Sequence, residues 1–149
     1  KWPNDVLLNG GKVAGILLEA DGQGSDVSYF SVGIGVNLTS APSQAEVEER
    51  ALRPVSLHSE TGSAVDPEHF LDVLAPAYAR HEAQLSTYGF APIREAWIAR
   101  AAKLGERVVA RMAAEEVVGT FETIDANGNI VLVTPKGRQT IAAADIFFS

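Results

Sequence analysis

The spacing of apolar residues changes twice along this chain of 149 residues, and the change restricts the folds open to it. Up to about residue 37, short apolar runs alternate with turn signals, as in strands. Between residues 67 and 101 apolar residues recur at helical spacing, and beyond Lys103 the short runs return. The sequence therefore predicts an α+β chain with strands at both ends and helices between them, rather than alternating βαβ units.

The first two thirds of the chain predict an antiparallel meander followed by two helices. Strands are expected at 6–8, 13–20 and 27–36, with a tight turn at 9–11, a polar loop at 21–26 and a surface loop at 38–55 that can hold one helical turn. Asp66 and Pro67 mark the start of a helix that Gly89 ends. A second helix begins at Ala91 and turns Trp97 towards the core.

The last third predicts a small β-barrel. Short strands are expected at 108–109, 117–124, 130–133, 139–142 and 146–148, with turns at 125–128 and 135–137. We place a boundary near Lys103, which gives domains of residues 1–102 and 103–149. The first domain carries 7 Lys and Arg against 13 Asp and Glu, and the second carries 5 against 6, so neither is basic.

Composition argues against several classes of function. Hydrophobic residues form 46% of the chain, which is enough for a core. A net charge of −7 argues against a nucleic-acid-binding surface. The sequence has no apolar run near the roughly 20 residues that span a bilayer, so no membrane segment is expected. Cysteine is absent, which excludes disulfides and thiolate metal sites and fits a cytoplasmic protein.

Three short segments carry residue types suited to a phosphorylated ligand. The first is K-W-P-N-D at residues 1–5. Asn4 and Asp5 place an amide and a carboxylate at the head of a strand, and a hard cation such as Mg²⁺ prefers oxygen ligands. Taken alone, the same pair also fits an ordinary turn or cap.

The second segment is K-V-A-G-I-L at residues 12–17. A lysine just after a Gly-Gly turn would stand at a sheet edge, and Gly15 lacks a Cβ, so a ligand could approach the backbone there. A solvated lysine and a bulge glycine are the simpler interpretation. Lys1 and Lys12 are nevertheless the only lysines in residues 1–102, and both lie in these segments.

The third segment is G-I-G-V-N at residues 33–37. Gly33 and Gly35 occupy alternate positions of a strand and project to one face, where they would leave a flat floor for a planar or chain-like ligand. Asn37 could offer its amide to a base edge or a phosphate. A dinucleotide-binding fingerprint is rejected, because the third glycine is absent and no helix follows directly.

Together and in this order, the three segments resemble the biotin–protein ligase family, of the biotin–[acetyl-CoA-carboxylase] ligase and holocarboxylase synthetase type. The family pattern is K-W-P-N-D, then K-x-x-G-I-L, then G-I-G-x-N, and this sequence matches each part. Residues 55–57 and 60–62 also resemble the family's segment before its long helix. The resemblance implies a class II synthetase-like domain, with an antiparallel or mixed sheet and helices on one face, followed by a Src-homology-3-like barrel.

The resemblance also implies an amide-forming ligase. With ATP, biotin and Mg²⁺, it would form biotinyl-5′-adenylate and then transfer biotin to a lysine of the biotin carboxyl carrier protein of acetyl-CoA carboxylase or a similar enzyme. Lys12 would be the catalytic cation and Asp5 the Mg²⁺ ligand. The implied substrate-binding residues are Asn4, Gly15, Ile16, Leu17, Gly33, Gly35 and Asn37, with Asn37 nearest the adenine.

The family also carries a loop, G-R-G-R-x-G-R, upstream of K-W-P-N-D, and this sequence lacks it. We therefore expect a fragment that holds part of the active site and does not ligate biotin by itself. The sequence leaves open whether a DNA-binding domain precedes Lys1 and whether the protein forms a homodimer, as family members do.

Two other functions remain open at this stage. A lipoate or octanoate ligase would share the sheet, although it is not expected to carry all three segments. A non-catalytic binding module would use the helices and the barrel for association. It predicts that Lys12→Ala leaves biotin transfer intact.

Overall fold

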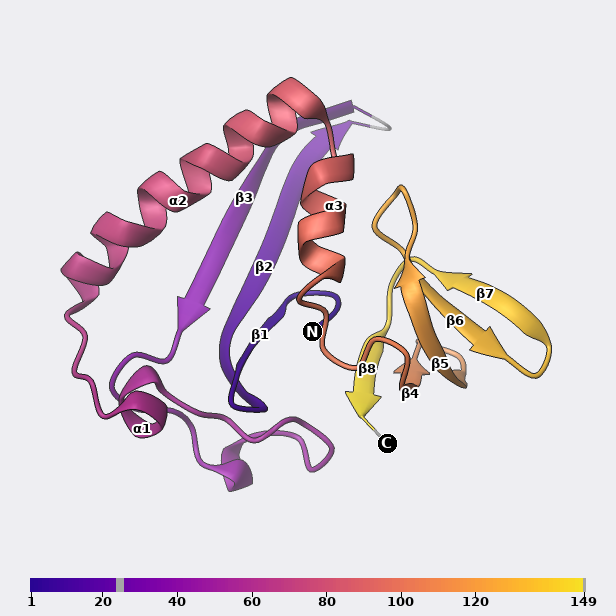
Figure 1. The fold of residues 1–149 in the computed structure, drawn as a ribbon, viewed down its shortest axis with the longest axis horizontal. Helices are drawn as coiled ribbons and strands as arrows, with labels where there is room; N and C mark the ends of the chain where they lie inside the picture. The colour runs from indigo at the N-terminus through magenta and orange to yellow at the C-terminus, as the bar shows by residue number, and fades with distance from the viewer. Residues whose placement is uncertain (24–25, 149) are drawn as a thin grey trace. The chain divides into compact units, whose positions relative to one another are not determined.

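The computed structural model describes residues 1–23 and 26–148 (Figure 1). Backbone contacts divide the chain into two units. One is Asn4–Asp66, and the other joins Lys1–Pro3 to the chain from Pro67 onwards. This division does not coincide with the boundary between residues 102 and 103, which the change from helical to strand-like spacing suggested and which stays a prediction. Within the described residues, no helix is both long and apolar enough to cross a membrane.

The unit Asn4–Asp66 is built on a three-stranded antiparallel sheet in the order β1-β2-β3 (Figure 1). Its elements are β1 (Asp5–Leu8), β2 (Gly11–Gln23), β3 (Asp26–Val36), the 3₁₀ turn η1 (Gln44–Glu46) and α1 (Leu57–Thr61). The predicted meander and the single helical turn within 38–55 are confirmed. The short helix α1 was not predicted.

The prediction of a polar loop at residues 21–26 is wrong for most of these residues. Strand β2 continues to Gln23 and β3 starts at Asp26, while residues 24 and 25 lie outside the described part of the chain. Backbone hydrogen bonds carry strand pairing, so polar side chains do not end it. Asp21 pairs with Tyr29, whose hydroxyl donates to the Asp21 carboxylate over 3.3 Å.

The core of this unit is small. Val13, Ala14 and Val55 are buried, and Leu8, Val36 and Leu57 pack against them. Gly11 lies so close to this core that a Cβ added there would sit 2.3 Å from Cγ1 of Val55. The glycine is therefore required by the close approach of the segment around Val55.

The second unit contains both long helices and the C-terminal barrel (Figure 1). Its elements are α2 (Pro67–Tyr88), α3 (Ala91–Ile98), β4 (Arg107–Arg111), β5 (Glu116–Ile124), β6 (Ile130–Thr134), β7 (Gly137–Ile141) and β8 (Asp145–Phe148). The five strands pair antiparallel in the order β7-β6-β5-β4-β8. The two predicted helices and the all-β C-terminal part are confirmed.

The barrel is filled by one large apolar cluster. Its buried members are Trp2, Val108, Ala110, Phe121, Ile124, Ile130, Leu132, Ile141 and Ile146. Trp97 of α3 meets the ring of Phe121 edge-on at 6.3 Å between centroids, which confirms that Trp97 packs in a core. Helix α3 therefore belongs with the barrel.

Trp2 is the unexpected member of this cluster. It is only 6% exposed, and its indole N–H donates to the carbonyl of Gly128 over 2.9 Å. Gly128 has a φ of +83° in the turn between β5 and β6. The K-W-P-N-D segment is thus divided, with Trp2 in the barrel unit and Asn4 and Asp5 in the sheet unit.

Candidate functional site

The pairing of β2 with β3 builds a flat floor on one face of the sheet. Gly15 lies opposite Gly35, and Leu17 lies opposite Gly33. A Cβ added at Gly35 would come no nearer than 4.0 Å to the carbonyl oxygen of Gly15, and one added at Gly33 would stay 3.8 Å from Leu17. Because directly paired residues share a face, Gly15 and Gly35 leave adjoining positions bare of side-chain atoms.

A β-bulge brings Lys12 to the same face. Val6 of β1 pairs with Ala14, but the next residue, Leu7, pairs with Lys12, so β2 carries Val13 as one extra residue. In a regular strand, Lys12 and Gly15 are three positions apart and would face opposite sides. The extra residue reverses this alternation, so the side chain of Lys12 lies on the same face as Gly15. A Cβ added at Gly15 would lie 3.4 Å from Cε of Lys12 and 3.5 Å from its Nζ.

Lys12 and Asp5 form an ion pair above this floor. Nζ of Lys12 lies 2.6 Å from Oδ1 of Asp5, whose partner across the strands is Gly15. The Lys12 side chain is 44% exposed and that of Asp5 is 13% exposed. The ammonium group is therefore held in place by a carboxylate while it remains open to a ligand from solvent.

An open cleft of about 510 Å³ covers this face of the sheet. It is lined by Asn4, Lys12, Gly15, Ile16, Leu17, Gly33, Ile34 and Gly35. Seven of the nine residues predicted for the site therefore line one cleft, and Ile34 is an addition. Of the other two, Asp5 reaches the cleft through its ion pair with Lys12.

Asn4 is fixed to β2 by two hydrogen bonds. Its side-chain amide donates to the carbonyl of Ile16 over 2.7 Å, and its own carbonyl accepts from the backbone N–H of Ile16 over 2.9 Å. The predicted interaction of Asn4 with a substrate remains a prediction. Its observed contacts hold the start of β1 against the cleft wall.

Asn37 lies directly after β3 and bonds to three segments of its own unit. Its side-chain amide donates to the carbonyl of Val55 over 2.9 Å, and its backbone bonds to Val13 and Leu57. These contacts join the sheet to the segment that leads into α1. A role of Asn37 near an adenine stays a prediction, because the structure does not place the residue among those that line the cleft.

Ser56 has a structural role. It is 1% exposed, and its hydroxyl accepts from the backbone N–H of Ser59 and donates to the carbonyl of Thr39. The residue thus caps the N-terminus of α1.

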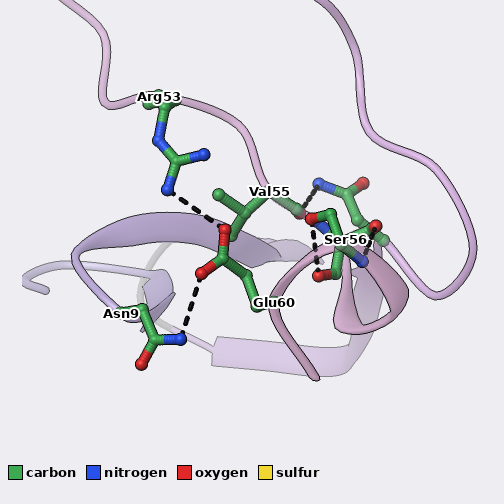
Figure 2. Close-up of polar contacts among 7 residues, drawn as sticks. Asn9, Arg53, Val55, Ser56 and Glu60 are labelled. Carbon is green, nitrogen blue, oxygen red and sulfur yellow. Dashed lines mark hydrogen bonds and ion pairs between the residues drawn. The ribbon is translucent and has the colours of Figure 1, made fainter. Parts of the chain in front are cut away.

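Sequence reasoning missed a polar cluster beside Lys12. Glu60 of α1 binds Asn9 and Arg53, which lie in the β1–β2 turn and in the segment before Val55 (Figure 2). Hydrogen bonds from Asn9 and then Arg53 lower the pKa of Glu60. The resemblance of residues 60–62 to a known family was a signal for this segment, but it gave Glu60 no role.

The donor set at the cleft fits a metal ion only in a limited way. Within residues 1–23 and 26–148, no three His, Cys, Asp or Glu side chains gather in one place. Asp5 supplies one carboxylate, already paired with Lys12. Such a site suits Mg²⁺ that arrives on phosphate oxygens and takes Asp5 as one further ligand, and it does not suit an ion held by protein groups alone.

A second hollow, of about 560 Å³, lies in the barrel unit. It is lined by Trp2, Pro3 and residues 111–113 and 142–145, which include three consecutive alanines. Arg111 and Asp145 form an ion pair of 3.1 Å there. The cleft on the sheet is the better candidate because it combines an accessible ammonium group with a backbone floor bare of side chains.

Comparison with known protein families matches both ends of the chain. Residues 103–149 match the model described as the biotin protein ligase C-terminal domain, and residues 1–37 match the biotin/lipoate A/B protein ligase family. A biotin–[acetyl-CoA-carboxylase] ligase of Paracoccus denitrificans is 63% identical over 99% of this chain. The chain is thus similar to biotin–protein ligases along nearly its whole length.

Other ligases extend this relationship. The bifunctional ligase/repressor BirA of Bacillus subtilis (strain 168) is 31% identical over 98% of the chain. The apo structure of biotin protein ligase from Aquifex aeolicus superposes with a TM-score of 0.83, at 23% identity, over 99% of this chain and 64% of that one. The A. aeolicus enzyme in complex with biotin and ATP gives a TM-score of 0.80. The expected α+β fold with a terminal all-β domain is therefore confirmed.

The chain spans only part of these ligases. It covers 62% of the length of the Paracoccus protein and 45% of that of the Bacillus protein. The activity of the complete protein is therefore a separate question from the similarity of this chain to those ligases.

Proposed function

We propose that this chain supplies Lys12, Asp5 and the glycine floor to the active site of an ATP-dependent biotin–protein ligase. The observation that carries the proposal is the ion pair of Lys12 and Asp5, 2.6 Å long, above the bare backbone of Gly15 and Gly35. The proposed reaction needs a fixed cation beside an apolar groove, and this cleft combines the two.

The first step of the proposed reaction joins biotin to AMP. A carboxylate oxygen of biotin attacks the α-phosphorus of ATP, and the bond to the β-phosphate oxygen breaks, which releases pyrophosphate. Negative charge increases on the α-phosphate oxygens in the transition state, and Lys12 would stabilise it. Mg²⁺ bound with ATP would take Asp5 as a ligand and neutralise phosphate charge.

The second step transfers biotin to a protein. The amine of a lysine on a biotin carboxyl carrier protein attacks the acyl carbon of the adenylate, an amide bond forms, AMP leaves with the bonding electrons, and the amine proton passes to solvent. Lys12 would again sit beside the departing phosphate. Ile16 and Leu17 would contact apolar parts of biotin, whereas Gly33 and Gly35 would lie under the adenylate.

The proposal is tested by Lys12→Ala in the complete protein. We expect formation of biotinyl-adenylate to fall about 10²–10³-fold, the usual loss for one preorganised electrostatic contact. Lys136→Ala, in an exposed turn of the barrel, is the control and should leave this step unchanged. Normal biotin transfer by Lys12→Ala would refute the catalytic role and favour a binding module.

A lipoate or octanoate ligase is the second candidate, because the family matched by residues 1–37 includes lipoate ligases. The match of residues 103–149 to a biotin ligase domain favours biotin. Thermal-shift titration of the complete protein separates the two. Stabilisation by biotin with no response to lipoate supports the first candidate, and the reverse supports the second.

Three further expectations belong to the same proposal. The protein partner would be the carrier domain of acetyl-CoA carboxylase or of a similar enzyme. The proposed location is the cytoplasm, which the absence of cysteine fits. The protein would form a homodimer, which light scattering of the complete protein can test.

A further inference from the structure

The carboxylate of Glu60 joins two segments that are distant in the sequence (Figure 2). One oxygen, Oε2, accepts from the side-chain amide of Asn9 over 3.0 Å, between residues 51 positions apart. The other, Oε1, pairs with Nη2 of Arg53 over 3.1 Å. The Glu60 side chain is 13% exposed, whereas that of Arg53 is 63% exposed, so the cluster lies at the surface of the unit. Hydrogen bonds from Asn9 and then Arg53 lower the pKa of this carboxyl group, so both contacts favour its charged form.

One partner of Glu60 lies in the turn that precedes Lys12, and the other bonds to the Lys12 backbone. Asn9, with a φ of +48°, forms the turn that leads into β2. The carbonyl of Arg53 accepts from the N–H of Lys12 over 2.9 Å, and the carbonyl of Lys12 accepts from the N–H of Val55 over the same distance. Lys12 is thus bonded on both sides to the segment that Glu60 holds.

This support matters because the direction of Lys12 depends on the bulge at Val13. A shift of one residue in strand register moves every side chain to the opposite face. If the bulge relaxed, the ammonium group would leave the side of Asp5 and Gly15. Fixing the turn before Lys12 and the segment paired with it holds the bulge in one register.

We propose that Glu60 is a positioning residue, which holds the bulged end of β2 through Asn9 and Arg53 so that Lys12 faces Asp5 across the cleft. The inference deepens the proposed ligase function and rests on it for the kinetic test. Glu60 bonds to Asn9 and Arg53, neither of which lines the cleft, and acts on Lys12 through these contacts.

Glu60→Gln tests the proposal in the complete protein. The variant keeps the size of the side chain but removes its charge and one acceptor. We expect kcat for biotinyl-adenylate formation to fall about 10-fold, because small misplacement of a reacting group is costly. The KM for biotin should stay within about twofold, since Ile16 and Leu17 are unaffected.

Glu46→Gln is the matched control. Glu46 lies in the same unit and accepts hydrogen bonds from the backbone N–H and the hydroxyl of Ser43, which lower its pKa as the partners of Glu60 do. The change of charge is therefore the same, but the site is elsewhere. We expect normal kinetics from this variant. An equal loss in both variants, or a loss that only follows the unfolded fraction in thermal melts, would overturn the inference.

Chemical labelling of Lys12 gives a readout that needs no activity. Acylation of the Lys12 amine, measured by peptide mass spectrometry, should be about two- to fivefold faster in Glu60→Gln, because the ion pair with Asp5 is loosened. Glu46→Gln should match the wild type. Equal labelling in all three proteins would overturn the positioning role.

The two readouts separate the inference from the function on which it rests. A wild-type protein that forms no biotinyl-adenylate would remove the proposed function, and labelling would still decide whether Glu60 positions Lys12. If the wild-type protein is active and Glu60→Gln is equally active, only the inference is removed.

A double-mutant cycle tests whether Asn9 and Glu60 act together. Asn9→Ala and Glu60→Gln combined should lower kcat by less than the product of their single effects.

Discussion

The sheet of Asn4–Asp66 and the C-terminal barrel use apolar residues in different ways. The barrel buries a cluster of nine side chains that includes Phe121 and Leu132, whereas the sheet buries three. On the sheet, Leu17 and Leu18 are more than half exposed. The residues with the chemistry proposed above lie in the unit with the smaller core. A bare, open face is poor for stability, but it leaves room for a ligand.

Glycines show the same contrast at the level of single positions. Gly119 in β5 is packed so tightly that a Cβ there would lie 2.9 Å from the carbonyl oxygen of Val133. At Gly35 the nearest atom would be 4.0 Å away. The first glycine therefore serves packing, and the second leaves space above the strand.

The largest expected effect is on the barrel core. Phe121→Ala should lower the free energy of unfolding by about 3–5 kcal/mol, because it removes a ring that is 2% exposed and leaves a cavity. Leu18→Ala, on the sheet, should cost less than about 1 kcal/mol because the side chain is 67% exposed. Chemical denaturation of the chain measures both, and equal losses would abolish the contrast between the two units.

Valine at the two glycines sharpens the comparison. Gly119→Val should destabilise the fold by about 1–3 kcal/mol through overpacking. Gly35→Val should leave the unfolding midpoint nearly unchanged but raise the KM for ATP or biotin in the complete protein about 10-fold or more, since it fills the floor of the cleft. Normal kinetics in Gly35→Val would show that no ligand lies against β3.

Trp2 tests the division of the K-W-P-N-D segment. Trp2→Phe keeps an aromatic ring but removes the N–H that binds the carbonyl of Gly128, so we expect a loss of about 1 kcal/mol in stability. The loss should appear in the unfolding of the barrel. Trp97→Phe is the matched change, because Trp97 packs by its ring against Phe121. Comparing the two variants separates the effect of a lost hydrogen bond from that of lost packing.

The smallest expected effect is a pH dependence of stability that comes from Asp125, in the turn between β5 and β6. Hydrogen bonds to Asp125, led by the one from the Asn129 side chain, lower the pKa of its carboxyl in the folded state. A lowered pKa stabilises the fold above the pKa of the unfolded chain, about 3.9, and this stabilisation is lost as the pH falls below that value. Between pH 5 and pH 3, the melting temperature of Asp125→Asn should therefore fall less than that of the wild type.

The elements of the chain were largely predictable because they depend on local patterns. Alternating apolar residues gave the strands, and Pro67 and Gly89 bounded the long helix α2. The short helix α1 was missed, since five residues provide too little periodicity to detect. Seven of the predicted residues line the cleft, whereas the hydrogen bond from the Asn37 side chain to the carbonyl of Val55 could not be predicted, because it joins segments 18 positions apart.

The sequence by itself determined the antiparallel meander of β1, β2 and β3, the alternate glycines of β3 and the three segments that resemble the family. Only the tertiary structure decided that Lys12 faces Asp5, because three-residue spacing in a regular strand would separate Lys12 from Gly15, and the bulge at Val13 reverses this. Hydrophobic periodicity does not encode a bulge. The bulge depends instead on distant partners such as Glu60, which only the folded chain brings beside it.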